Sequence, residues 1–95
     1  MALKVILYGT SWCSDCVRSK RVLKLAHIKY EEIDIDEIAN AEDAMRALNG
    51  GSGKVPTILI ESEGRRDILI EPSDPDLKAV LAAHQLAPEI AEKTC

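Results

Sequence analysis

The amino-acid sequence predicts an α/β fold in which a four-stranded mixed sheet carries helices on both faces. Short runs rich in Ile, Val and Leu alternate with stretches in which apolar residues recur every three or four positions. The first pattern is typical of strands and the second of amphipathic helices. Two of the strand runs are separated only by a short polar stretch with glycine, which indicates a hairpin. The predicted order is β-α-β-α-β-β-α.

The first half of the chain reads as strand, helix and strand. Residues 5–8 form an apolar run closed by Gly9, and residues 28–35 alternate apolar with acidic side chains. Between them, residues 13–28 have helical periodicity. Two strands joined through a helix are expected to be parallel. The helix has a predicted basic outer side formed by Arg18, Lys20, Arg21 and Lys24.

The second half begins with a helix and continues with a hairpin. Apolar residues within 38–49 are spaced by three and four, and the glycine pair that begins at Gly50 predicts the helix end. The runs 58–60 and 68–70 flank Gly64 and its polar neighbours. They are therefore expected to pair as antiparallel strands.

A third helix is expected to close the domain. Ser73 or Asp74 is the predicted N-cap, and Pro75 is expected at the first helical position. Helical spacing continues to about residue 84. We therefore predict one domain over residues 1–86 and a C-terminal tail over residues 87–95.

Composition narrows the classes of partner. The chain has 95 residues and a net charge of -4, which argues against general nucleic-acid binding. The apolar run at residues 5–8 is too short for a signal-peptide core, and no stretch approaches the length of a membrane span. We expect a cytoplasmic monomer that binds neither nucleic acid nor membrane.

Cys13 and Cys16 are three residues apart, a spacing that suits a metal half-site, a crosslink or a redox pair. Cys13 is predicted at the junction of strand and helix, where unpaired backbone N–H groups and the helix dipole favour a thiolate. A thiolate is the species that attacks a disulfide. Cys16 lies one turn further into the helix, where it is placed to resolve a mixed disulfide on Cys13.

The metal and crosslink interpretations are weaker. A structural zinc site needs four ligands, and the remaining candidates, His27, His84 and Cys95, form no second closely spaced pair. A disulfide that closes so short a loop removes little chain entropy. Both histidines are predicted at helix ends or on the surface, and Cys95 is predicted to be a free thiol.

The stretch 54–57, Lys-Val-Pro-Thr, is the second signal. Pro56 precedes a strand although proline cannot donate to a sheet ladder. A cis bond before Pro56 explains this placement, and it leaves the backbone of Val55 free to pair with an extended thiol peptide. A trans proline that begins an edge strand is the alternative; the upstream cysteine pair favours cis.

These residues resemble the thioredoxin superfamily and, within it, the glutaredoxin-like redoxins. The resemblance covers residues 3–84, and in detail the chain is similar to the mycoredoxins. It implies a thioredoxin-like fold in which Cys13 is the nucleophile and Cys16 the resolving cysteine. It further implies that Val55, beside cis-Pro56, pairs with the bound thiol. The motifs that carry it are Trp12-Cys13-x-x-Cys16-x-Arg18, Val55-Pro56-Thr57 and Ser73-Asp74.

The same resemblance implies a site for the charged end of a small thiol at Ser73 and Asp74. Arg18 is a candidate to attract an anionic thiol or an acidic protein partner, with a solvated helix face as the alternative. Lys54, next to Val55, is a candidate to meet a ligand carboxylate. Trp12, which precedes the nucleophile, is expected to shield or position a partner, or to serve packing. No metal-binding residue is predicted.

Two departures from ordinary glutaredoxins bear on the choice of reductant. Ser14-Asp15 replaces the usual Pro-Tyr between the cysteines, and the Asp15 carboxylate is expected to oppose the Cys13 thiolate. Glu71-Pro72 replaces a Gly-Gly pair before the last helix. Glu71 is expected to repel a ligand carboxylate. Glutathione, mycothiol and a protein reductant therefore all remain open.

The predicted activity is glutaredoxin-type reduction of protein disulfides or of mixed disulfides between proteins and small thiols. No bound cofactor is expected. One alternative is an electron donor to ribonucleotide reductase that thioredoxin reductase recharges. Another is an iron–sulfur carrier, in which two chains share a cluster through the Cys13 thiolates and two small thiols.

Overall fold

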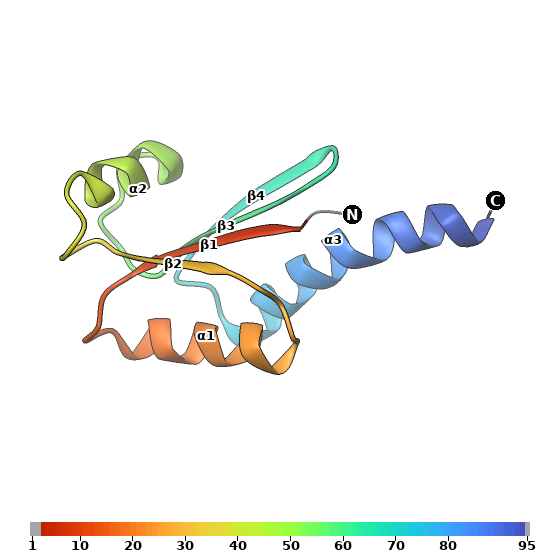
Figure 1. The fold of residues 1–95 in the computed structure, drawn as a ribbon, viewed down its shortest axis with the longest axis horizontal. Helices are drawn as coiled ribbons and strands as arrows, with labels where there is room; N and C mark the ends of the chain where they lie inside the picture. The colour runs from red at the N-terminus through yellow and green to blue at the C-terminus, as the bar shows by residue number, and fades with distance from the viewer. Residues whose placement is uncertain (1–2, 95) are drawn as a thin grey trace.

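The computed structural model describes the backbone of residues 3–94 and the side chains of residues 3–85, and it confirms the predicted element order. Strands and helices alternate until the hairpin, and a long helix ends the chain (Figure 1). The elements are β1 Lys4–Gly9, α1 Ser14–Leu25, β2 Glu31–Asp34, α2 Ala41–Asn49, β3 Thr57–Ser62, β4 Arg65–Ile70 and α3 Asp74–Thr94.

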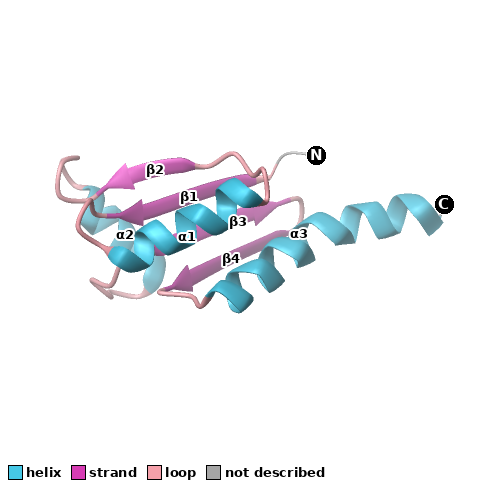
Figure 2. Ribbon diagram, turned by 90° about the horizontal axis from the view of Figure 1, so that it is seen from below, coloured by secondary structure: helices cyan, strands magenta, loops and turns pink. Residues whose placement is uncertain are grey.

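The four strands form one mixed sheet in the order β2-β1-β3-β4. β1 is parallel to β2, and the pairs β1/β3 and β3/β4 are antiparallel. Figure 2 shows the four strands side by side, with α1 and α3 in front of them. The helical connection between β1 and β2 accounts for their parallel direction.

Helices cover both faces of the sheet. α1 and α3 pack on one face and α2 on the other (Figure 1). The first face buries Leu7, Leu23, Ile58, Ile60 and Leu77 without measurable exposure, together with Val5, Val22, Ile28 and Leu81. The second face is smaller and centres on Met45. The cluster around Met45 extends to Cys13 and Cys16 at the N-terminal end of α1, and it includes Ile6, Tyr8, Val55 and Leu59.

Several element ends differ from the prediction because local turns intervene. α1 stops at Leu25, and His27 adopts a left-handed φ of 58°. β2 therefore starts only at Glu31. α2 begins at Ala41, after a turn that includes the hydrogen bond from the Asp36 N–H to Asp34 Oδ1.

The last helix is longer than predicted. α3 continues to Thr94, so residues 87–94 are helical rather than a tail. Ala, Glu and Lys, which favour helix, make up most of this segment. Cys95 lies outside the described residues. No helix in the described part of the chain has the length and apolar content needed to cross a membrane.

Candidate active site around the Cys13–Cys16 pair

Cys13 is the N-cap residue of α1. Its backbone is extended, and its sulfur accepts a hydrogen bond from the Cys16 N–H at 3.0 Å. This is the role that a serine or aspartate oxygen usually performs at a helix start. A sulfur that carries negative charge gains more from such a donor and from the positive end of the helix dipole than a neutral thiol does. The Cys13 sulfur therefore lies where the N-terminus of α1 can stabilise negative charge.

Cys16 is completely buried beneath Cys13. Burial raises the pKa of the Cys16 thiol to about 12, and the hydrogen bond with the Cys13 side chain adds to the increase. A backbone hydrogen bond from Thr10 and the charge of Lys20 act in the opposite direction. Cys16 is thus a neutral thiol at physiological pH, next to a cysteine placed to react first.

Gly9 makes this close packing possible. A Cβ atom at Gly9 would lie 2.7 Å from the Cys16 sulfur, nearer than side-chain carbons approach other atoms. The end of β1 can therefore run directly beside the resolving sulfur only because residue 9 has no side chain. The sequence signal was the glycine that closes the first apolar run, although sequence reasoning assigned it no functional role.

The loop before β3 brings Val55 to the cysteines. The Val55–Pro56 peptide bond is cis, as predicted, and the Cys13 thiol donates to the Val55 carbonyl oxygen at 3.7 Å. Asn49 and Thr57 brace this loop, since the Asn49 amide donates to Thr57 Oγ1 at 2.9 Å and Thr57 in turn donates to the Lys54 carbonyl at 3.0 Å. Neither Asn49 nor Thr57 was a candidate from sequence.

Arg18 connects α1 to the start of α3. It lies 3.1 Å from Asp74 Oδ1, donates to the Pro72 carbonyl oxygen at 3.1 Å, and lies 3.5 Å from Asp15 Oδ1. Ser73 caps α3, because its hydroxyl accepts from the Asp76 N–H at 3.2 Å. Of the predicted thiol-binding residues, the structure therefore pairs Arg18 with Asp74 and uses Ser73 as the helix cap.

The other predicted ligand residues also have internal partners. Lys54 Nζ is 3.9 Å from Glu71 Oε1, and the Glu71 N–H donates to the Pro56 carbonyl oxygen at 2.8 Å. Trp12 is 73% exposed, yet its indole N–H donates to Asp36 Oδ2 at 2.9 Å. Asp36 lies in the turn after β2, where it holds the tryptophan.

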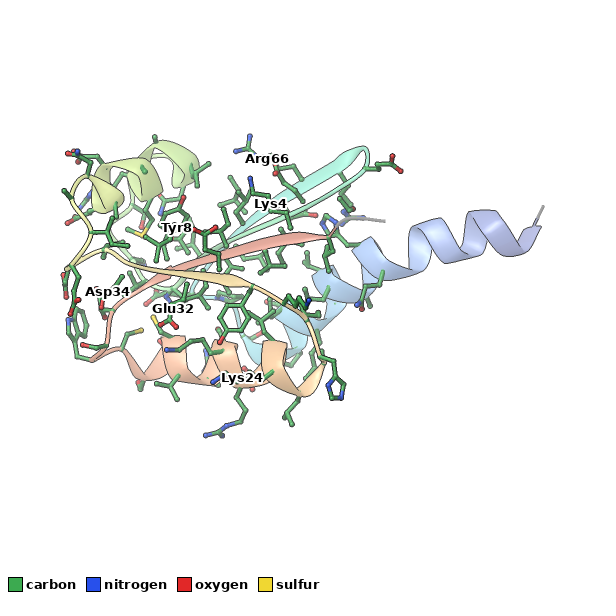
Figure 3. All side chains as sticks on the ribbon, viewed as in Figure 1. Lys4, Tyr8, Lys24, Glu32, Asp34 and Arg66 are labelled. Atoms are coloured by element: carbon green, nitrogen blue, oxygen red, sulfur yellow. The ribbon has the colours of Figure 1, made fainter. Side chains whose placement is uncertain are left out.

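Lys20 departs from the predicted basic outer side of α1. Its ammonium is 2.7 Å from Glu32 Oε2, and its side chain is only 21% exposed. Figure 3 shows Glu32 on the face of the sheet that α1 covers and Tyr8 on the opposite face. Periodicity alone did not separate Lys20 from Arg21 and Lys24, because the position of β2 decides which lysine has an acidic neighbour.

His84 and Ser14 lie in different surroundings. The prediction that His84 lies at a helix end or on the surface is wrong, because His84 is 2% exposed within α3. Ser14, between the cysteines, is exposed. Among the side chains of residues 3–85, no group of three or more His, Cys, Asp or Glu residues is arranged to hold a metal ion.

Comparison with known proteins agrees with the geometry. The glutaredoxin family model matches residues 5–64. A Mycobacterium tuberculosis protein described as a glutaredoxin is 37% identical over 75 residues, which are 79% of this chain and 86% of that protein. The resemblance to the glutaredoxin-like redoxins is thereby confirmed.

Solved structures agree on the fold. The glutaredoxin of Archaeoglobus fulgidus superposes with a TM-score of 0.70 at 23% identity, covering 81% of this chain and 84% of that one. A thioredoxin of Arabidopsis thaliana superposes with a TM-score of 0.67 at 20% identity, covering 86% of this chain and 77% of that one. The chain has a thioredoxin-like fold and belongs to the glutaredoxin family of thiol–disulfide oxidoreductases.

Proposed function

We propose that this protein reduces protein disulfides, and mixed disulfides between proteins and small thiols, by a dithiol mechanism at Cys13 and Cys16. The observation that supports it best is the 3.0 Å hydrogen bond from the Cys16 N–H to the Cys13 sulfur. This bond and the helix dipole stabilise charge on Cys13, whereas burial keeps Cys16 protonated. The two sulfurs therefore have different roles: Cys13 attacks and Cys16 resolves.

The reaction proceeds in two exchanges. The Cys13 thiolate attacks one sulfur of the substrate disulfide, and the other substrate sulfur leaves as a thiolate. Cys16 then loses its proton and attacks Cys13, so the second substrate sulfur is released and the Cys13–Cys16 disulfide forms. The Val55 carbonyl, 3.7 Å from the Cys13 sulfur, borders the position where an extended substrate backbone would lie. A small thiol or a protein reductant then restores the dithiol, and we place this cycle in the cytoplasm.

Single-cysteine variants test the mechanism. Cys13→Ser is expected to lose all reductase activity toward a disulfide-containing protein. Cys16→Ser is expected to accumulate a mixed disulfide on Cys13, detectable by mass spectrometry, and to turn over only when a small thiol releases it. Full activity of Cys13→Ser would exclude the proposed mechanism.

A protein reductant such as thioredoxin reductase is the second candidate for recharging the pair. It is favoured because the charges expected to bind a small thiol are paired internally, Arg18 with Asp74 and Lys54 with Glu71. A thiol with charged ends would compete with those partners for Arg18 and Lys54, at a small cost because both pairs are partly exposed. An electron donor to ribonucleotide reductase would use the same protein-based recharging route.

The reductants can be separated by direct comparison. The oxidised protein is mixed with glutathione, mycothiol, or thioredoxin reductase with NADPH, and the return of the free thiols is followed over time. Fast reduction by the reductase alone supports the protein route. Fast reduction by glutathione or mycothiol without the reductase excludes a requirement for the protein reductant. An Arg18→Gln variant serves as a probe: it frees Asp74 and also Asp15, so it should change the small-thiol rates more than the rate with the reductase.

A further inference from the structure

The resolving cysteine presents a chemical difficulty that the pair alone does not solve. Cys16 has no exposed surface, and its pKa is raised to about 12 by burial in the first place. Only its thiolate can attack the mixed disulfide on Cys13. A nearby group that stabilises negative charge on the Cys16 sulfur would therefore speed that step.

The elements packed around Cys16 offer few charged or titratable groups. β1 contributes Tyr8, in the same buried cluster, and Gly9, which approaches the Cys16 sulfur closely; the Thr10 backbone follows. On α1 the neighbours are Cys13 and Lys20, and Lys20 follows Cys16 by four residues, so both side chains lie on one face of the helix. That face turns inward, since Ser19 and Leu23 beside them have no exposed surface.

β2 determines where the Lys20 ammonium lies. Glu32 pairs in register with Leu7 of β1, two residues before Gly9, and Figure 3 shows Glu32 on the α1 side of the sheet. The 2.7 Å ion pair with Glu32 therefore holds the Lys20 ammonium between α1 and the strand pair, on the side of the helix where Cys16 is buried. Tyr30, just before β2, is the other titratable group next to this ion pair.

We propose that Lys20, held in place by Glu32, is a positioning residue that stabilises the Cys16 thiolate during resolution of the mixed disulfide. This inference rests on the dithiol mechanism proposed above. Cys16 releases its proton, and its sulfur forms a bond to the Cys13 sulfur. The bond between Cys13 and the substrate sulfur breaks, and its electron pair leaves with the substrate thiolate, which takes up a proton. Two electrons thus pass from the dithiol to the substrate disulfide, and the Lys20 charge opposes the cost of the buried anion.

The two exchanges can be timed separately with an aromatic disulfide, 5,5′-dithiobis(2-nitrobenzoate), under stopped flow. Attack by Cys13 releases the first coloured thiolate, and attack by Cys16 on the mixed disulfide releases the second. Lys20→Met is expected to slow the second release about tenfold at neutral pH and to move its pH profile to higher pH. The reason is that a single nearby charge changes the pKa of a thiol by about one unit. The first release should keep its wild-type rate.

Matched variants distinguish this role from a structural one. Lys20→Arg restores a fixed positive charge and is expected to restore most of the second rate. Glu32→Gln leaves Lys20 charged but unpaired and should give an intermediate rate. Lys24→Met removes a lysine from the exposed side of α1 and should leave both releases unchanged. Lys20→Gln provides a second test in case Lys20→Met folds poorly.

The outcomes separate the two proposals. A wild-type second release in both Lys20→Met and Lys20→Gln would overturn the role of Lys20 and leave the dithiol mechanism standing. A slow second release whose pH profile is unshifted would assign Lys20 a packing role and would also overturn the inference. A first release that persists in Cys13→Ser would instead overturn the underlying mechanism.

Discussion

The redox end of the molecule and its hairpin end both bury polar groups, but they treat those groups differently. At the hairpin end, His84 of α3 is 2% exposed, and each ring nitrogen has a partner: Ser62 Oγ at 2.6 Å and Asp67 Oδ2 at 2.8 Å. At the redox end, the buried hydroxyls of Thr10 and Ser19 have no hydrogen-bond partner among residues 3–85.

The buried His84 has a structural role, whereas the buried Cys16 has a chemical one. A buried polar group with all its partners makes a region rigid, and removing one partner costs stability. The redox end instead keeps Cys16 neutral and buried, next to Cys13, where it must ionise for a moment. A site whose polar groups all had internal partners would gain little free energy from reacting with a substrate.

The largest expected effect is a loss of stability that comes from the hairpin end alone. His84→Ala removes two hydrogen bonds, leaves a cavity and deprives Asp67 of a buried partner. We expect a loss of about 3 kcal/mol in the free energy of unfolding, measured in urea. Disulfide-reductase activity per folded molecule should not change. The control is Gln85→Ala, on an exposed position of the same helix. A parallel loss of specific activity would mean that the two ends are coupled.

Gly9→Ala attacks the redox end by sterics. The new Cβ would meet the Cys16 sulfur at 2.7 Å, and we expect a loss of about 2 kcal/mol with slower resolution of the mixed disulfide. Cys16→Ala removes the obstructing sulfur. The double variant should therefore be more stable than the sum of the single changes predicts, as urea unfolding of all four proteins would show. Additive losses would contradict the contact.

Alkaline pH should weaken the redox end through Cys16. Because its folded-state pKa is raised to about 12, the unfolded chain ionises first and folding loses stability as pH rises above about 8.5. The loss should reach about 1.4 kcal/mol near pH 9.5. Urea unfolding of the wild type and Cys16→Ala, both kept reduced with a phosphine, checks this. Parallel pH curves for the two proteins would refute it.

Acidic pH should weaken the hairpin end through Asp67. The hydrogen bond from Arg65, together with that from His84, lowers the pKa of Asp67. Its stabilising contribution is thus complete above its unfolded pKa of about 4 and is lost as pH falls through the folded value. Asp67→Asn should cost about 1 kcal/mol at pH 6 and less in stronger acid. Glu63→Gln, at the exposed hairpin tip, is the control, and its stability difference from wild type should not shrink as the pH falls.

The smallest expected effect concerns Asp15. Its carboxylate is expected to oppose a thiolate at Cys13, but Arg18 lies 3.5 Å away and the Asp15 side chain is 45% exposed. We therefore expect Asp15→Asn to speed iodoacetamide alkylation of Cys13 only about twofold at neutral pH, and less in high salt. Asp43→Asn on α2 is a matched control. Identical rates for wild type and Asp15→Asn would show that Arg18 already neutralises the carboxylate.

The sequence by itself determined the order of elements, the position of Cys13 at a strand-to-helix junction and the cis bond before Pro56. Each of these depends on short-range patterns: apolar periodicity, the spacing of two cysteines, and a proline before a strand. Such patterns are readable because the side-chain directions of a helix or strand repeat within a few residues.

The tertiary structure alone decided which partners the charged and polar residues have. Arg18 meets Asp74, 56 positions later in the chain, and His84 meets Asp67 and Ser62, all across elements whose relative placement no local pattern encodes. Lys20 differs from Lys24 only because β2 brings Glu32 to it. Contacts between distant segments are set by how the helices and sheet pack, so the burial and pairing of these residues emerged only with the fold.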